Sequence, residues 1–308
     1  MSEPDRRTVL VALWQMSRPA QLALIALVYA SRRRDGARPR RDGRPRGCGY
    51  RSGRARPDRR ERPLRERVRR DAETDTLTER TPFSGGSGAL AETGLPRRLA
   101  LRAAVASAVI GLLLARGRVQ SHSPGGRCRR SPPPCFGGVL LVGWQYSLGP
   151  LRLAWRGLGE VTNAALGGIA LPLYGFAVVA DRVTVAAALA TVPFALVVFV
   201  NLLETQWPDR WADAAVGKQT LATRWSPRRL RAMYGLASLV AAGSAVALAG
   251  RVLPSVVAVG TLVPMVGLVP GYRRFTRREE PLPAVATMVV TAATTTVAWG
   301  AVAAGLAG

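Results

Sequence analysis

The chain has 308 residues, a formal net charge of +25 and a hydrophobic fraction of 48%. A charge of this size could indicate nucleic-acid binding, but most of the excess lies in two short segments, and long apolar runs dominate the rest. A soluble core has no use for so many uninterrupted runs. These features exclude a soluble nucleic-acid-binding protein and favour an integral membrane protein.

Apolar runs of membrane-spanning length follow one another along the chain. A bilayer core requires about 20 apolar residues in a helix. A shorter run lies at 136–148, and seven longer ones lie at 10–30, 99–114, 161–180, 183–203, 233–250, 252–271 and 283–308. The sequence therefore predicts one all-α membrane domain over 1–308, with seven or eight recognisable spans and a multi-pass place in the cell membrane.

Basic residues are unevenly divided between the loops. If 71–98 faces the cytoplasm, the loops at 147–160, 204–231 and 272–280 face it too, and they are rich in arginine. The opposite loops carry little beyond Arg182 and Arg251. This asymmetry is typical of membrane proteins with positive inner loops. The topology lacks one span before residue 71, and a lost second helix would account for it.

Residues 31–70 and 117–135 differ from everything around them. Segment 31–70 holds 18 Arg and 5 acidic residues, and both segments are rich in Pro and Gly; together they contain all three cysteines and the only histidine. Lys218 is the only lysine in the chain, which is typical of an arginine-rich product of a GC-rich gene. We hypothesise that both segments are translated out of frame. The alternative is a pair of disordered basic loops that bind anionic lipid headgroups or nucleic acid.

Two loops on the predicted cytoplasmic side contain the pattern D-x-x-x-D. The first pair is Asp71 and Asp75, and the second is Asp209 and Asp213. Residues four apart share one face of a helix, and paired carboxylates suit Mg²⁺, which also bridges to substrate phosphate oxygens. Ordinary charged loop helices would give the same pattern. Two pairs in matched loops predict a site for a metal-bound diphosphate.

Residues near these pairs are further candidates. After the first pair comes S-G-G-S-G at 84–88, whose backbone amides could face an anion or simply form a flexible turn. After the second pair, Lys218 and Arg224 could neutralise a diphosphate or only add to the loop charge. Asn201 and Tyr146, near the ends of spans, are candidates for substrate contact or for packing between helices.

These motifs resemble the UbiA superfamily of membrane prenyltransferases. Members carry N-x-x-x-D-x-x-x-D in one cytoplasmic loop and D-x-x-x-D-x-x-x-G-K/R-x-T-L in another. Here the second motif is complete from Asp209 to Leu221, whereas Arg67 occupies the position of the asparagine in the first. Further points of likeness are R-P at 18–19, Y-S-L-G-P at 146–150 and G-L-G-E at 157–160.

The resemblance implies a bundle of nine spans that transfers a polyprenyl group from its diphosphate to an aromatic or lipid acceptor. The catalytic, metal-binding residues that it implies are Asp71, Asp75, Asp209 and Asp213. Mg²⁺ on these residues would stabilise the departing diphosphate. The implied substrate-binding residues are Arg18, Tyr146, Asn201, Lys218 and Arg224.

Several functions are compatible with this resemblance. The S-G-G-S-G segment resembles the branch that prenylates dihydroxynaphthoate in quinone biosynthesis, and an ether-lipid enzyme acting on geranylgeranylglyceryl phosphate is an alternative. A non-catalytic transport protein is another, although transporters more often have broken helices or charges at the bilayer midplane. The last alternative is an inactive product of a damaged gene.

Overall fold

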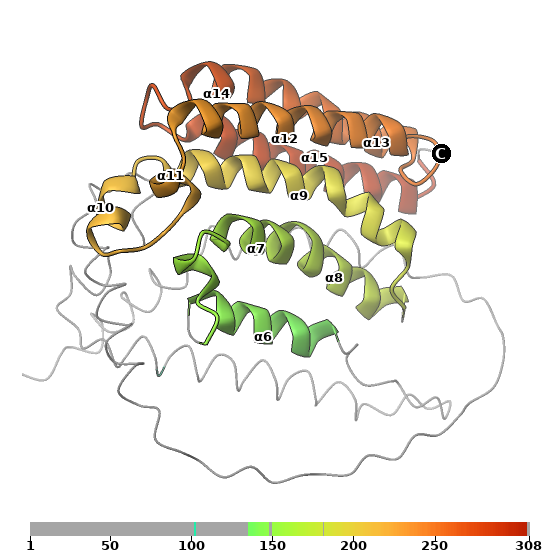
Figure 1. Cartoon of the computed structure of the whole chain (residues 1–308). Helices are drawn as coiled ribbons and strands as arrows, with labels where there is room; N and C mark the ends of the chain where they lie inside the picture. Colours follow the sequence, from blue (N-terminus) through green and yellow to red (C-terminus); the bar gives the residue numbers. More distant parts are fainter. Residues whose placement is uncertain (1–101, 103–134, 148–149, 181, 307–308) are drawn as a thin grey trace, which may run out of the picture.

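The computed structural model describes residues 102, 135–147, 150–180 and 182–306. Within these residues every regular element is helical, and the longer helices lie side by side with their axes roughly parallel (Figure 1). This arrangement confirms the predicted all-α bundle. The elements are α6 (Cys135–Ser147), η1 (Leu153–Trp155), α7 (Gly159–Ala165), η2 (Leu166–Ala170), α8 (Leu171–Ala180), α9 (Val185–Gln206), α10 (Arg210–Ala215), α11 (Leu221–Arg224), α12 (Pro227–Leu248), α13 (Ser255–Leu262), η3 (Val263–Gly267), α14 (Leu268–Arg274) and α15 (Leu282–Ala303).

Each apolar run predicted within the described part of the chain forms a helix or a series of helices. The run at 161–180 becomes α7, the π-helical turn η2 and α8, and the run at 252–271 becomes α13, η3 and α14. Among the described residues, four helical stretches are long and apolar enough to cross a membrane: Val185–Gln206, Pro227–Leu248, Ser255–Arg274 and Leu282–Ala303.

The remaining predicted segments lie outside the described residues. These are the runs at 10–30 and 99–114, apart from the single described residue Arg102, together with residues 31–70 and 117–134. Cys135, the last residue of the second basic segment, is the first residue of α6.

Side-chain caps explain where two of the long helices begin. The Thr184 hydroxyl accepts a hydrogen bond from the Ala187 N–H at 3.1 Å, and α9 starts at the next residue, Val185. Ser226 occupies the same position before α12, and Pro227 follows it as the first helical residue. Thr and Ser are preferred at the N-cap of a helix, because the hydroxyl accepts a hydrogen bond from an otherwise unpaired N–H. Pro is preferred at the first helical position, because it has no N–H to leave unpaired.

The main core lies between α9, α12 and the helices that follow them. Val200, Leu230 and Tyr234 are completely buried there, and Leu268 and Phe275 pack against them from α14 and the residue after it. The Tyr234 ring lies 5.2 Å from the Phe275 ring, centroid to centroid. This core holds the C-terminal part of the bundle together.

At Gly168, the π-helical turn crosses α9 at very short range. A Cβ atom added there would overlap the Ala195 Cα and lie 2.7 Å from its Cβ. The absence of a side chain is therefore what permits this crossing, as is common where membrane helices approach closely.

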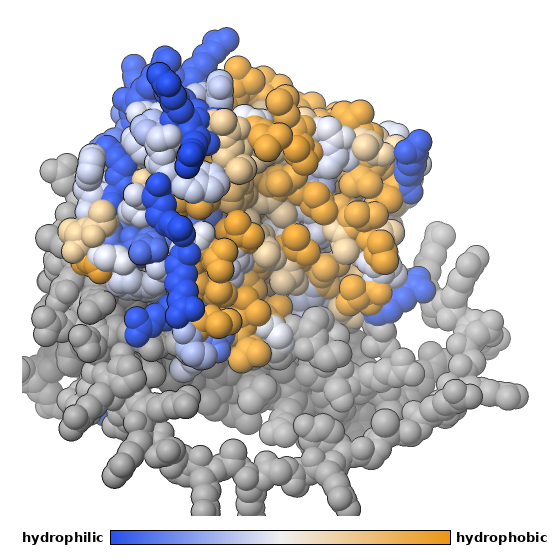
Figure 2. Space-filling view, in the orientation of Figure 1, coloured by the Kyte–Doolittle hydropathy of each residue, from blue (hydrophilic) through white to orange (hydrophobic). Residues whose placement is uncertain are grey.

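The surface divides into an apolar middle and a charged end. Figure 2 shows hydrophobic residues over the middle of the bundle and hydrophilic ones gathered at the end that carries α10 and α11. Large apolar side chains are freely exposed on the membrane-capable helices, including Leu239 on α12, Val266 on η3 and Val297 on α15. An exposed band of this kind suits contact with lipid, and it agrees with the four membrane-capable helices.

Three of the predicted basic loops meet at the charged end. A backbone bridge joins Arg156 to Gln219, which brings the loop before α7 to the segment between α10 and α11. An ion pair of 2.8 Å joins Arg210 to Glu279 in the loop before α15. The loops at 147–160, 204–231 and 272–280 therefore share one end of the bundle, as the charge asymmetry predicted.

Candidate functional site

The second acidic motif forms the short helix α10, just after the long helix α9 ends. Asp209 occupies its N-cap position, and Asp213 follows one turn later, with its N–H donating to the Asp209 carbonyl at 2.9 Å. The two carboxylates therefore lie on the same helix face, as their spacing predicted. Asp213 is buried, with 1% of its surface exposed, whereas Asp209 is partly exposed.

A glycine turn then brings the chain back onto Asp213. Gly217 has a φ of +75°, and its N–H donates to the Ala214 carbonyl at 3.0 Å, while the Lys218 N–H donates to the Asp213 carbonyl at 2.8 Å. This pair of bonds is a Schellman motif, which favours glycine at that position. The Lys218 Nζ then lies 3.0 Å from the Asp213 Oδ1. The spacing of aspartate, glycine and lysine thus has a direct structural reason.

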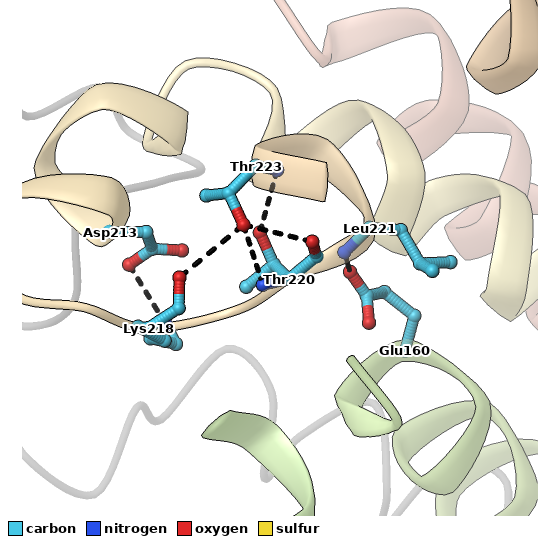
Figure 3. Close-up of polar contacts among 6 residues, drawn as sticks. All are labelled: Glu160, Asp213, Lys218, Thr220, Leu221 and Thr223. Carbon is cyan, nitrogen blue, oxygen red and sulfur yellow. Dashed lines mark hydrogen bonds and ion pairs between the residues drawn. The ribbon is translucent and has the colours of Figure 1, made fainter. Parts of the chain in front are cut away.

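The two threonines after the lysine cap the next helix. The Thr220 hydroxyl accepts from the Thr223 N–H at 3.3 Å, and the Thr223 hydroxyl accepts from the Thr220 N–H at 2.9 Å (Figure 3). The Thr223 hydroxyl also lies 3.3 Å from the Lys218 carbonyl oxygen. This reciprocal capping box fixes the backbone directly after Lys218.

Glu160, in the first turn of α7, reaches this segment from another part of the chain. Its Oε1 accepts a hydrogen bond of 2.6 Å from the Leu221 N–H (Figure 3). The residue is 1% exposed, and its Oε2 is buried without a hydrogen-bond partner among the described residues. Glu160 was not among the predicted site residues. The available signal was a lone carboxylate directly before an apolar run, inside the G-L-G-E segment.

Burial raises the pKa of both the Asp213 and the Glu160 carboxyl groups. It raises the pKa of Asp213 above its usual range, against the opposing effect of the Lys218 ammonium. Burial also raises the pKa of Glu160, and the hydrogen bond from the Leu221 N–H works in the other direction. The main cause in both cases is the same, because a buried carboxylate loses the water that stabilises its charge.

The residues present fit one side of a Mg²⁺ site. The Asp213 Oδ2 is buried and accepts no hydrogen bond in the described part of the chain, so this oxygen remains available to a cation. Among the described residues no three His, Cys, Asp or Glu side chains gather as a complete metal site. Mg²⁺ is commonly held by one or two carboxylates together with substrate phosphates and water, and Asp209 and Asp213 are the two described carboxylates that would hold it from the protein side.

The other predicted site residues have different surroundings. The Arg224 Nη1 lies 3.4 Å from the Arg156 carbonyl oxygen, so this side chain contacts the loop before α7 instead of the acidic pair. Asn201 lies in α9, where its Oδ1 is buried without a hydrogen-bond partner among the described residues. Tyr146 lies near the end of α6 and is partly buried. The structure does not describe Arg18, Asp71 and Asp75.

Comparison with known proteins gives one family. Residues 70–294 match the model of the UbiA prenyltransferase family. The match begins one residue before Asp71 and includes both acidic motifs and Lys218. No curated protein and no solved structure matches the chain significantly. Because the family match covers well over half of the 308 residues, the chain belongs to the UbiA prenyltransferase family.

Proposed function

We propose that this protein transfers a polyprenyl group from its diphosphate to an acceptor in the membrane, in a reaction that depends on Mg²⁺. Family membership supports a membrane prenyltransferase. The observation that carries the metal dependence is the Asp213 carboxylate, which is buried at the charged end of an apolar bundle. One of its oxygens binds Lys218, and the other accepts no hydrogen bond among the described residues.

The metal's contribution is to neutralise the negative charge that develops on the diphosphate. Asp209 and Asp213 would hold it from the protein side. Lys218 contributes a second positive charge, and its ammonium group carries three N–H donors. One of them binds Asp213 at 3.0 Å, which places the positive charge beside the carboxylate proposed to hold the metal. Stabilising charge that appears in the transition state is usually the largest catalytic contribution of such a site.

The reaction breaks the bond between the first carbon of the prenyl chain and the diphosphate oxygen. The bonding electrons leave with the diphosphate, where Lys218 stabilises them, and an allylic cation remains. The acceptor attacks this cation and then loses a proton. Asp213 belongs to α10, which lies at the hydrophilic end of a bundle whose middle is apolar (Figures 1 and 2). This arrangement supports a substrate with a charged head and an apolar tail. The tail would then extend between the membrane helices.

We further propose an aromatic acceptor of quinone biosynthesis, supported by the S-G-G-S-G segment at 84–88. An ether-lipid acceptor is the alternative. Membranes containing the protein would be given a polyprenyl diphosphate, Mg²⁺ and either dihydroxynaphthoate or geranylgeranylglyceryl phosphate, and products would be identified by mass spectrometry. Prenylated dihydroxynaphthoate is the expected product. Transfer to the glyceryl phosphate alone would identify the ether-lipid activity, and transfer unaffected by EDTA would contradict the metal dependence.

We also propose that residues 31–70 and 117–134 arise from out-of-frame translation. Their composition, rich in Arg, Pro and Gly and unlike the apolar runs around them, supports this. Resequencing the gene across codons 31–71 and 117–136 tests the idea. Closely related genes that encode the same residues would contradict it. If the proposal is correct, we expect the frame-corrected protein to be far more active than the present chain.

A further inference from the structure

Two segments far apart in the sequence contact each other at the charged end of the bundle. One is the loop before α7, and the other comprises residues 217–224, here called the lysine segment. They meet at the backbone bridge between Arg156 and Gln219, at the 3.4 Å contact of Arg224 with Arg156, and at the 2.6 Å bond from Leu221 to Glu160. The last of these contacts is the only buried one of the three.

The lysine segment is fixed from both sides of Lys218. Before the lysine, the Schellman turn ties its backbone to α10. After it, the capping box of Thr220 and Thr223 orders the start of α11. The capping box leaves the Leu221 N–H unpaired within α11, and Glu160 accepts that bond. The Thr223 hydroxyl also lies 3.3 Å from the Lys218 carbonyl oxygen, so the ordered start of α11 restrains the backbone of the lysine.

We propose that Glu160 is a positioning residue, which holds the lysine segment through the Leu221 N–H so that Lys218 stays on Asp213. The proposal rests on the proposed function in one respect, since it gives Lys218 the role of stabilising the departing diphosphate. Glu160 itself need not touch the substrate. Its effect passes through the backbone of α11 to the lysine.

The burial of Glu160 argues that its hydrogen bond to the Leu221 N–H has a structural role. A carboxylate that is 1% exposed, with one oxygen lacking a hydrogen-bond partner, is costly to bury. Lys218 lies close enough to lower the pKa of Glu160 by its charge, and Asp213 close enough to raise it. Glu160 is therefore part of the electrostatic surroundings of the lysine as well as its backbone anchor.

The unique lysine provides a direct test that needs no enzymatic activity. An endoproteinase specific for lysine can cut this chain only after Lys218, so the cleavage rate measures how well the segment is held. In the full chain in detergent, we expect Glu160→Ala to be cut roughly ten- to a hundredfold faster, the range given by loss of one bond to a charged acceptor. Glu160→Gln keeps an acceptor oxygen, so its rate should stay close to that of the unmodified chain.

Glu204 offers a matched control. Its Oε2 also accepts a backbone N–H from the first turn of a helix, that of Ala284 at 3.1 Å, and it is also buried. It binds α15 instead of the lysine segment. We expect Glu204→Ala to leave cleavage after Lys218 nearly unchanged. An unchanged rate in Glu160→Ala, or an equal increase in Glu204→Ala, would overturn the positioning role.

A double-mutant cycle on diphosphate release connects the position to the reaction. If Glu160 acts through Lys218, Glu160→Ala should slow release strongly in the unmodified background and little in the Lys218→Ala background. Glu204→Ala should change diphosphate release by the same factor in the unmodified background and in the Lys218→Ala background. Independent, multiplicative effects of Glu160→Ala and Lys218→Ala would overturn the inference alone. Full activity in Lys218→Ala would instead refute the role that the proposed function gives to the lysine.

Discussion

The crossing of η2 and α9 predicts opposite effects for two adjacent glycines. At Gly168 an added Cβ would lie 2.7 Å from the Ala195 Cβ and 3.2 Å from its backbone N, and neither atom belongs to a flexible side-chain end. At Gly167 an added Cβ would meet no atom within 4 Å among the described residues. The two positions share one helical turn and one residue type, and they differ in the space around the Cβ.

The expected changes in the free energy of unfolding follow from these surroundings. Gly168→Ala should lower the free energy of unfolding by about 1–3 kcal/mol, because overpacking forces the helices apart. Gly167→Ala should raise it by about 0.5–1 kcal/mol, because alanine loses less backbone freedom than glycine in a helix. The two variants should therefore differ by about 1.5–4 kcal/mol.

Thermal unfolding of the purified chain in detergent, followed by circular dichroism, measures this difference. The expected order of stability is Gly167→Ala, then the unmodified chain, then Gly168→Ala. Equal midpoints for the two variants would refute the close crossing of η2 and α9. A lower midpoint for Gly167→Ala than for Gly168→Ala would show that the close contact lies at Gly167 and would contradict the predicted crossing.

Other predictions concern caps, turns and surface charges. Thr184→Ala should destabilise the chain by about 0.5–2 kcal/mol, since it removes the hydroxyl that caps α9, while Thr184→Ser should be nearly neutral in the same unfolding assay. Gly217→Ala and Gly250→Ala should each cost about 1 kcal/mol, because both glycines have positive φ and open space. Only the former should also slow diphosphate release, and equal release by the two would argue against a role for the turn before Lys218. Glu279→Gln should change stability by less than about 0.5 kcal/mol, because the Glu279 carboxylate in this ion pair is more than half exposed to solvent; a larger loss would show that the pair holds the two loops together.

In the described part of the chain, the long apolar helices were predictable from hydropathy alone. The run at 183–203 corresponds closely to α9, because length and apolar content suffice to identify a span. The internal interruptions were not predictable. The π-helical turn at Leu166–Ala170 depends on how neighbouring helices cross, which hydropathy does not record. The 3₁₀ turn at Val263–Gly267 contains Pro264, a helix-interrupting residue that a hydropathy average overlooks.

The candidate site likewise has some features that the sequence predicts and others that only the tertiary structure reveals. The spacing of Asp209 and Asp213 predicted a shared helix face, and local turn geometry then accounts for Lys218. The burial of Asp213 could not be read from a loop sequence, since it depends on how the ends of separate helices pack. The bond between Glu160 and Leu221 joins positions 61 residues apart, so only the tertiary fold brings it into view.

The central claim is that a buried carboxylate at the charged end of the bundle supports departure of a diphosphate. The most direct measurement is diphosphate release from a polyprenyl diphosphate and acceptor, by membranes containing the frame-corrected protein or its Asp213→Asn variant. Glu279→Gln, at the same end of the bundle, is the control. We expect Asp213→Asn to reduce release by about 10²–10³-fold, the usual effect of removing one electrostatic contact to developing charge, and Glu279→Gln to match the unmodified protein. Full activity in Asp213→Asn at equal protein amount would contradict the role assigned to this carboxylate.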